Sequence, residues 1–228
     1  MRVVKLEHYG SSALQELSSK MQHVRRLGLH GKLAVVTGAS GTIGQAIAKL
    51  LFENGASVVL TGRNEAKLEQ AAAAIRVGES GDPTIDCIPC DVTVEDSVVA
   101  LFDAIDQKHS RIDLLVNNAG TNVPGATVDL SGADFEKVLQ VNVLGPFLCA
   151  REAIKRMKRQ QSGRIINIGS LSASSPRPDS CPYTTSKFAL NGLSQSLALD
   201  ARSDRISVGI VHPGNVMSEL LTQEMMQE

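Results

Sequence analysis

Residues 33–60, LAVVTGASGTIGQAIAKLLFENGASVVL, decide the fold of this chain. The stretch opens with a short continuous apolar run, LAVV, which is typical of a strand buried on both faces. A glycine-rich turn follows, then apolar residues at helical spacing, and a second apolar run, SVVL, completes the stretch. The order strand, glycine turn, helix, strand predicts one βαβ unit.

The turn contains Gly38, Gly41 and Gly44. A helix that begins at such a turn offers unpaired backbone N–H groups and a positive dipole end to a phosphate. Glycine is needed there because a β-carbon would keep a pyrophosphate away from the backbone. The alternative is a structural turn that binds nothing. A position between a buried strand and an amphipathic helix favours phosphate binding.

The rest of the chain repeats the alternation of strands and helices without internal repeats. Apolar runs predict strands at 84–90, 112–116, 163–168 and 206–211, and helical spacing predicts helices at 65–76, 94–108, 134–160 and 182–201. This order predicts an α/β fold with a doubly wound parallel sheet, a Rossmann fold, in one three-layer α/β/α domain.

Chemically distinctive residues follow directly on these strands. Parallel strands joined by right-handed crossovers bring all their carboxyl ends to one edge of the sheet. Ligands bind at that edge in open α/β sheets. The residues expected there are Gly38, Arg63, Asp91, Asn118, Ser170 and Pro213. Their placement predicts a ligand-binding enzyme.

Composition narrows the class of protein further. The 228 residues are 43% hydrophobic and 21% charged, with a net charge of −1, which is ordinary for a globular protein. Aromatic residues make up only 3% and there is no basic stripe, so a nucleic-acid partner is not expected. No apolar run approaches the roughly 20 residues that span a bilayer, so no membrane partner is expected.

The four scattered cysteines favour a reducing compartment, and the predicted location is the cytoplasm. Cys87 and Cys90 have the spacing of half a zinc site, but no second pair lies nearby, and no metal is expected.

Residues 1–30 differ from the remainder, with five basic residues against two acidic ones. A surface arm or short helix that packs on the domain is the favoured interpretation. A basic, serine-containing leader could instead be a transit peptide, which would allow a location in the mitochondrial matrix.

Tyr183 and Lys187 are four residues apart at the start of a predicted helix, so both project from one face. An ammonium beside a phenol favours the phenolate and lowers the tyrosine pKa. Such a tyrosine can exchange a proton near neutral pH. Ser170 ends the preceding predicted strand, so it could present its hydroxyl to the oxygen with which Tyr183 exchanges the proton. Asn142, inside the earlier predicted helix, could contribute a backbone carbonyl or its side chain to the same site.

The chain resembles the short-chain dehydrogenase/reductase superfamily over about residues 31–218. The motifs that carry the resemblance are TGASGTIG at 37–44, Asp91-Val92, NNAG at 117–120, Asn142 to Gly145, Ser170, Tyr183 to Lys187, and Pro213-Gly214 with Val216 and Ser218. The interval from Ser170 to Tyr183 is the usual one in that family. The resemblance implies that residues 31–228 form an NAD(P)-binding Rossmann domain.

The resemblance also implies an activity, the interconversion of a ketone and a secondary alcohol by hydride transfer. It implies that Tyr183 passes a proton to the substrate oxygen, Lys187 holds the nicotinamide ribose, Ser170 orients the substrate, and Asn142 keeps a water that links Lys187 to solvent. The cofactor-binding residues that it implies are Gly38, Ser40, Ile43, Gly44, Asp91, Val92, Asn118, Ala119, Gly120, Tyr183, Lys187, Pro213, Gly214, Val216 and Ser218. Among family members, the 3-oxoacyl-thioester reductases are the most similar in texture.

Charge indicates which dinucleotide binds. NAD-preferring relatives place a carboxylate after the second strand, where it accepts hydrogen bonds from the ribose 2′-hydroxyl. Here Gly62 and Arg63 follow that strand. A guanidinium pairs with a 2′-phosphate, so NADP is predicted and NAD is the less favoured cofactor. The alternative for Arg63 is a solvated surface residue.

Two features depart from the family pattern. The glycines are spaced TGxxGxxG, as in the extended branch of epimerases and dehydratases, and not TGxxxGxG as in the short branch. The NNAG motif, the interval from Ser170 to Tyr183 and the short chain nevertheless favour the short, single-domain branch. The sequence also ends at Glu228, where relatives continue into a substrate-covering segment and a last strand. We expect the lid and the last strand to be lacking, so that either the protein is a shortened version or a partner completes the pocket. A non-catalytic NADP-binding or interaction protein is therefore the alternative function. The family resemblance further implies a homo-oligomer, with a dimer formed through helices 134–160 and 182–201.

Overall fold

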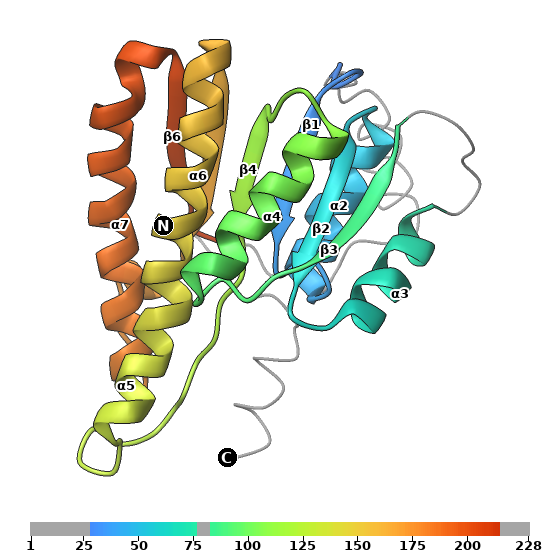
Figure 1. The fold of residues 1–228 in the computed structure, drawn as a ribbon. Coiled ribbons are helices and arrows are strands. Elements are labelled where there is room, and N and C mark those ends of the chain that lie inside the picture. Colours follow the sequence, from blue (N-terminus) through green and yellow to red (C-terminus); the bar gives the residue numbers. More distant parts are fainter. Residues whose placement is uncertain (1–27, 77–82, 215–228) are drawn as a thin grey trace, which may run out of the picture.

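The predicted alternation of strands and helices runs through all of the chain that the computed structural model describes, residues 28–76 and 83–214 (Figure 1). The strands are β1 (Leu33–Thr37), β2 (Ser57–Gly62), β3 (Ile85–Pro89), β4 (Leu114–Asn117), β5 (Gly163–Ile168) and β6 (Ile206–Val211). The helices are α2 (Thr42–Glu53), α3 (Glu65–Ile75), α4 (Glu95–Lys108), α5 (Gly132–Leu139), α6 (Gly145–Gln160) and α7 (Cys181–Ala201). Three short turns are η1 (Gln140–Leu144), η2 (Leu171–Ala173) and η3 (Arg202–Asp204).

All strand pairs are parallel, and the order across the sheet is β3-β2-β1-β4-β5-β6. The chain therefore runs outward from β1 to β3, returns, and runs outward again from β4. This reversal between β1 and β4 is the topological switch point, at which open α/β sheets bind their ligands. The prediction of a doubly wound parallel sheet is confirmed.

Helices cover the sheet on both faces and bury two apolar clusters. Residues of β1 alternate between them: Val35 belongs to the cluster with α4, α6 and α7, whereas Ala34 and Val36 belong to the cluster with α2 and α3. Every β1 residue is buried, as expected for a central parallel strand. The sheet is thus the middle layer of an α/β/α sandwich.

The predicted helix 134–160 is interrupted by a π-helical turn. Ser131 and Asp134 form a capping box that starts α5, and the five-residue turn η1 separates α5 from α6. The N–H of Gly145 bonds to the carbonyl of Gln140, five residues back. Pro146 follows and has no N–H, so the α-helical bond to the Asn142 carbonyl cannot form. The proline therefore lies in the first turn of α6, directly after the wider turn.

Several predictions from the sequence fall on residues that the structure does not describe. The N-terminal arm or leader, residues 1–30, lies outside the described part except for its last three residues, and Val216, Ser218 and the C-terminal segment also lie outside it. Among the described helices, none has the length and apolar character required to cross a membrane.

Candidate active site

A cavity of about 990 Å³ lies at the carboxyl edge of the sheet, across the switch point. Of the residues predicted from the sequence, it is lined by Gly38, Ser40, Ile43, Gly44, Arg63, Asp91, Val92, Asn118, Ala119, Gly120, Ser170, Tyr183, Lys187, Pro213 and Gly214. Asn142 is buried behind the cavity wall and does not line it. The expected clustering of strand-end residues at one edge is therefore present.

The glycine turn is shaped first by packing inside the protein. A β-carbon on Gly38, whose φ is +62°, would lie 2.8 Å from the Ala119 Cα, and one on Gly44 would lie 2.4 Å from the Gly38 carbonyl oxygen. On Gly41 the nearest atom would be 3.5 Å away, an ordinary contact. The sequence argument attributed all three glycines to a pyrophosphate. For Gly38 and Gly44 the protein's own backbone already requires glycine.

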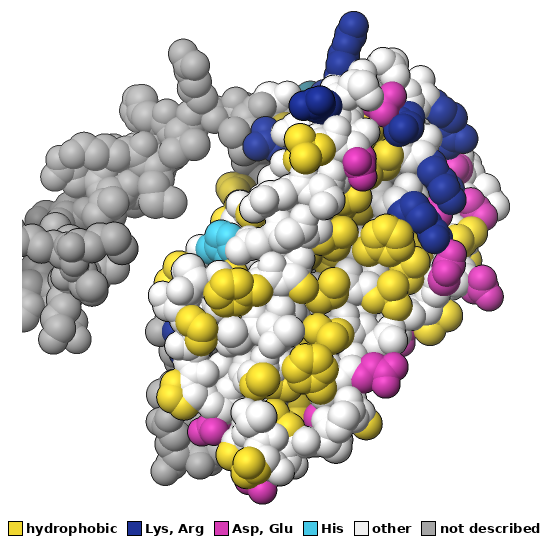
Figure 2. Space-filling model, turned by 90° about the vertical axis from the view of Figure 1, so that its left-hand side faces the viewer, with side chains coloured by type: hydrophobic (Ala, Val, Ile, Leu, Met, Phe, Trp, Pro, Cys, Tyr) yellow, Lys and Arg dark blue, Asp and Glu magenta, His cyan; other side chains and the backbone are white. Residues whose placement is uncertain are grey.

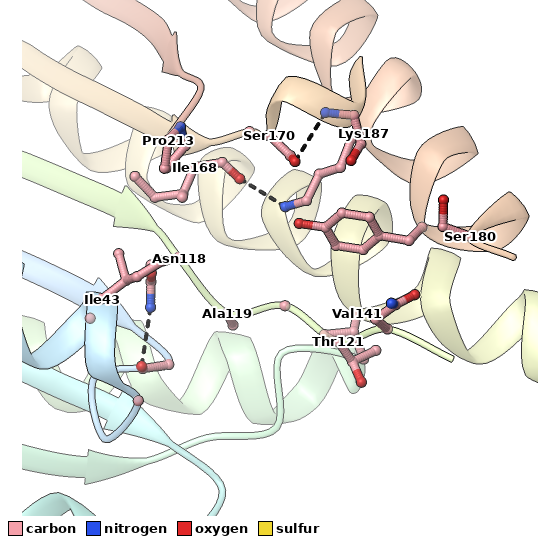
Figure 3. Close-up of a pocket in the computed structure, with 18 of the residues that line it drawn as sticks. Ile43, Asn118, Ala119, Thr121, Val141, Ile168, Ser170, Ser180, Lys187 and Pro213 are labelled. Atoms are coloured by element: carbon pink, nitrogen blue, oxygen red, sulfur yellow. Dashed lines mark hydrogen bonds between the residues drawn. The ribbon is translucent and has the colours of Figure 1, made fainter. Parts of the chain in front are cut away.

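Thr37 and Asn118 hold this turn against the end of β4. The Thr37 hydroxyl accepts hydrogen bonds from the backbone N–H groups of Asn118 (2.9 Å) and Ala119 (3.0 Å). The Asn118 side chain donates to the carbonyls of Thr37 (2.9 Å) and Gly38 (3.1 Å), as Figure 3 shows in part. Asn118 thus positions the glycine turn. Thr37 also positions the glycine turn, although the sequence analysis predicted a site role for the neighbouring Gly38 and not for Thr37.

At the far end of the cavity Arg63 and Asp91 approach one another after β2 and β3. Arg63 is exposed and Asp91 half-buried. Burial by itself would raise the pKa of the Asp91 carboxyl, but hydrogen bonds from the Thr93 N–H and hydroxyl, together with the Arg63 charge, hold it below its usual range. This end therefore carries a fixed carboxylate and a guanidinium at the cavity wall.

Lys187 is buried in the wall of the same cavity, beside Tyr183. Its Nζ donates a hydrogen bond of 2.9 Å to the Ile168 carbonyl at the end of β5 and lies 5.4 Å from the centre of the Tyr183 ring (Figure 3). Burial lowers the pKa of this amine from 10.5 to about 8. The expected side-by-side placement of Tyr183 and Lys187 is present, in the same cavity as the glycine turn.

The depressed pKa of Lys187 predicts how stability depends on pH. Below about pH 8 the buried amine is charged in the folded and unfolded chains, and folding carries the full cost of burying the charge. Between about 8 and 10.5 the unfolded chain binds a proton that the folded chain does not, so stability rises with pH. Relative to Lys187→Met, the free energy of unfolding of the unaltered chain should rise across this range by up to about 3 kcal/mol. Urea unfolding at several pH values measures it, and parallel curves would contradict it.

Asn142 connects three elements instead of facing the cavity. Its side chain exchanges two hydrogen bonds with the Thr121 backbone (2.8 and 2.9 Å) and donates a third to the Ser186 hydroxyl (2.9 Å). The sequence left open whether Asn142 contributes its backbone carbonyl or its side chain to the site. The side chain is used by these internal hydrogen bonds. The carbonyl, which lacks its α-helical donor because of Pro146, is the group left for a functional role.

Sequence reasoning missed the half of the cavity beyond Tyr183. It is built from two irregular loops and the side of α5, and its lining includes Thr121, Asn122, Pro124, Gly125, Ala126, Lys137, Val141, Leu171, Ser172, Arg177, Pro178, Asp179 and Ser180. The Gly125 N–H donates to the Asp179 carbonyl (2.8 Å), which joins the loops. Loops lack periodicity, so their only sequence signal was their content of proline, serine and glycine.

Metal binding has no support in the described ranges, where no group of three histidine, cysteine or acidic side chains lies close enough to hold an ion.

The fold and the cavity define a dinucleotide-binding protein of the Rossmann class. The chain belongs to the short-chain dehydrogenase family, since the sequence model of that family matches residues 32–228. It is therefore an oxidoreductase of that family. Its sequence is 40% identical over 192 residues to nodulation protein G of Rhizobium sp. (strain N33). The matched region covers 84% of this chain and 76% of that protein. It is 35% identical, with the same coverage, to a 3-oxoacyl-[acyl-carrier-protein] reductase of Rickettsia conorii.

Solved structures agree with this assignment. The crystal structure of 3-ketoacyl-(acyl-carrier-protein) reductase from Brucella melitensis complexed with NADH superimposes with a TM-score of 0.79 at 31% identity, covering 85% of this chain and 80% of that one. Another similar structure contains NADP. The family therefore binds NAD(P), and the resemblance proposed from the motifs is confirmed.

Proposed function

We propose that this protein is an NADP-dependent ketoreductase that interconverts a ketone and a secondary alcohol. The observation that carries the proposal is the convergence of Ser170, Tyr183 and Lys187 on the cavity that also contains the glycine turn. This convergence supports a catalyst over the alternative of a non-catalytic binding protein, because a binding module does not require a buried lysine of lowered pKa beside a tyrosine.

The cavity suits a dinucleotide. The N-cap residue of α2, Gly41, forms no side-chain cap, and the first turn of that helix has no acidic residue, so its N–H groups are available to a phosphate. We assign the pyrophosphate to this turn, the adenine to Asp91 and Val92, and the ribose neighbours to Asn118, Ala119 and Gly120. The nicotinamide is assigned to Pro213 and Gly214, followed by Val216 and Ser218.

A nicotinamide dinucleotide supplies or accepts the hydride. The Tyr183 hydroxyl donates its proton to the carbonyl oxygen during reduction and recovers it during oxidation. Ser170 donates a hydrogen bond to the same oxygen. Lys187 binds the nicotinamide ribose and stabilises the tyrosinate, and the Asn142 carbonyl holds a water through which Lys187 exchanges protons with solvent.

For the substrate we propose a 3-oxoacyl thioester. Lys137 and Arg177 line the cavity half beyond Tyr183, and thioester carriers bear phosphate groups that such cations attract. The direct experiment follows the oxidation of NADPH by absorbance with 3-oxoacyl thioesters and with a panel of simple ketones. Cofactor binding without turnover of any of them would favour the non-catalytic alternative.

Cofactor choice should depend on Arg63. Arg63→Asp is expected to raise the Kd of NADPH by at least about tenfold and to leave that of NADH within about twofold, because the variant loses a charge-assisted bond to the 2′-phosphate. Lys67→Asp is the matched control. Lys67 is exposed like Arg63, but it lies on α3 and does not line the cavity. Titration of reduced-nicotinamide fluorescence measures both constants. An unchanged preference in Arg63→Asp would refute the NADP assignment.

We further propose a homodimer that pairs α6 and α7 with the same helices of a second copy. These helices expose Phe147, Phe188 and Leu199, and Figure 2 shows hydrophobic side chains gathered along the middle of the face that α7 presents. Sedimentation of the full chain tests this, and a monomer at micromolar concentration would contradict it.

The four unpaired cysteines fit a reducing compartment, and we propose the cytoplasm.

A further inference from the structure

His212 is a polar side chain at the carboxyl edge that the mechanism does not use. It is the first residue after β6 and directly precedes Pro213. It does not line the cavity, and the sequence suggested only a strand-end residue. Its ring nevertheless contacts the backbone of Ser170, the residue assigned to the substrate oxygen.

The contact begins where the β5–β6 ladder ends. Ile168 is the last residue of β5 paired with β6, and one further backbone bond joins the Gly169 N–H to the Val211 carbonyl (2.7 Å). His212 Nδ1 then lies 2.8 Å from the Ser170 carbonyl oxygen and 3.1 Å from the Ser170 nitrogen. An imidazole thus continues the connection between the two segments where their paired strands have ended.

Either tautomer of the ring can make this connection. With a proton on Nδ1 the ring donates to the Ser170 carbonyl, and without it Nδ1 accepts from the Ser170 N–H. The contact therefore needs a side-chain atom that can donate or accept at this position, and an apolar side chain of the same size cannot supply one.

Gly169 provides the space for the ring. A β-carbon at this residue would lie 2.5 Å from His212 Nδ1, closer than atoms approach without bonding. Gly169 and His212 are therefore a matched pair: the missing side chain of one accommodates the ring of the other. Lys187 bonds to the carbonyl of the preceding residue, Ile168, so the end of β5 is held by two side chains.

We propose that His212 is a positioning residue, whose imidazole fixes the backbone of Ser170 and thereby the hydroxyl that meets the substrate oxygen. The proposal rests on the ketoreductase function proposed above. Ser170 also accepts a hydrogen bond at its hydroxyl from the Ser172 N–H (3.1 Å), and its carbonyl accepts one from the Ala173 N–H (3.0 Å). Both of these bonds come from the following turn, whereas His212 ties the Ser170 main chain to the segment after β6.

Three full-length variants test the proposal. His212→Leu removes the polar atom at similar size, and His212→Asn restores an amide near the position of Nδ1. His30→Leu is the matched control, because the His30 ring is also packed where a β-carbon on a glycine, Gly55, would lie, but away from the cavity. The measurements are kcat and KM for the ketone, the Kd of NADPH, and deuterium exchange of the peptide covering residues 163–173.

We expect His212→Leu to lower kcat by about tenfold or more with the Kd of NADPH within about twofold, and to speed exchange at Ser170. His212→Asn should recover most of the activity and protection, and His30→Leu should match the unaltered chain. A loss that appears in NADPH affinity and not in kcat would overturn the proposal, as would unchanged exchange in His212→Leu. An unaltered chain that reduces no ketone would refute the proposed function instead, and the exchange data would still decide whether His212 holds Ser170.

Discussion

Tyr183→Phe should lower kcat for ketone reduction by about 10²- to 10⁴-fold, because it removes the hydroxyl that we propose as the proton donor to the substrate oxygen. The ring remains, so its contact with the Lys187 amine, 5.4 Å from the ring centre, should persist. The Kd of NADPH should therefore change little. Steady-state rates with the best substrate of the panel, together with fluorescence titration of NADPH, measure both quantities.

The pattern of loss separates chemistry from folding. Thermal unfolding of Tyr183→Phe should match that of the unaltered chain within a few degrees, which shows that the loss is not structural. Thr185→Ala, on the same helix but exposed, is a suitable control. Retention of more than half of kcat in Tyr183→Phe would remove the proton-transfer role from the proposed mechanism.

The second large effect is expected on stability and distinguishes two glycines of one turn. Gly44→Ala would place a β-carbon 2.4 Å from the Gly38 carbonyl oxygen and 2.6 Å from the Asn118 amide nitrogen. The gain in helix propensity from alanine, about 1 kcal/mol, only partly offsets such overpacking. We expect a loss of about 2 kcal/mol or more in the free energy of unfolding by urea, together with weaker cofactor binding.

Gly41→Ala is the matched comparison. Its β-carbon meets nothing closer than 3.5 Å, so stability should stay within about 1 kcal/mol of the unaltered chain. Because Gly41 lines the cavity, the added methyl group should still raise the Kd of NADPH by about tenfold. A Gly41→Ala protein that binds NADPH as tightly as the unaltered chain would mean that the pyrophosphate does not lie over this turn. Equal stabilities of the two variants would contradict the packing argument.

Much of the fold was predictable because its signals are local. Continuous apolar runs identified the six strands, and glycine, arginine and aspartate at their ends identified the part of the cavity to which we assign the cofactor. The handedness of crossovers placed the carboxyl ends of the strands at one edge, whereas the order of the strands came from the structure. Each of these inferences depends on a few neighbouring residues, which a single sequence displays.

The parts that escaped depend on distant contacts. The break at η1 is an exception, since the missing N–H of Pro146 beside it was visible in the sequence but no break was inferred there. The commitment of Asn142 to Thr121 and Ser186, and the contact of His212 with Ser170, join segments more than 20 residues apart. The glycines showed a similar limit, because Asn118 and Ala119, their packing partners just after β4, could not be read from the turn itself.

The hydrogen bond between Gly125 and Asp179 joins two loops that line one half of the cavity, and these loops differ from the strand ends that line the other half. The part to which we assign the cofactor is built from the ends of regular strands, whose positions are tied to the core. The half beyond Tyr183 is built from two surface loops joined to each other. Insertions or exchanges in those loops would change which molecule fits without moving the proton-transfer groups. A family of enzymes with one chemistry and many substrates can diversify in this way, at little risk to the architecture that every member needs.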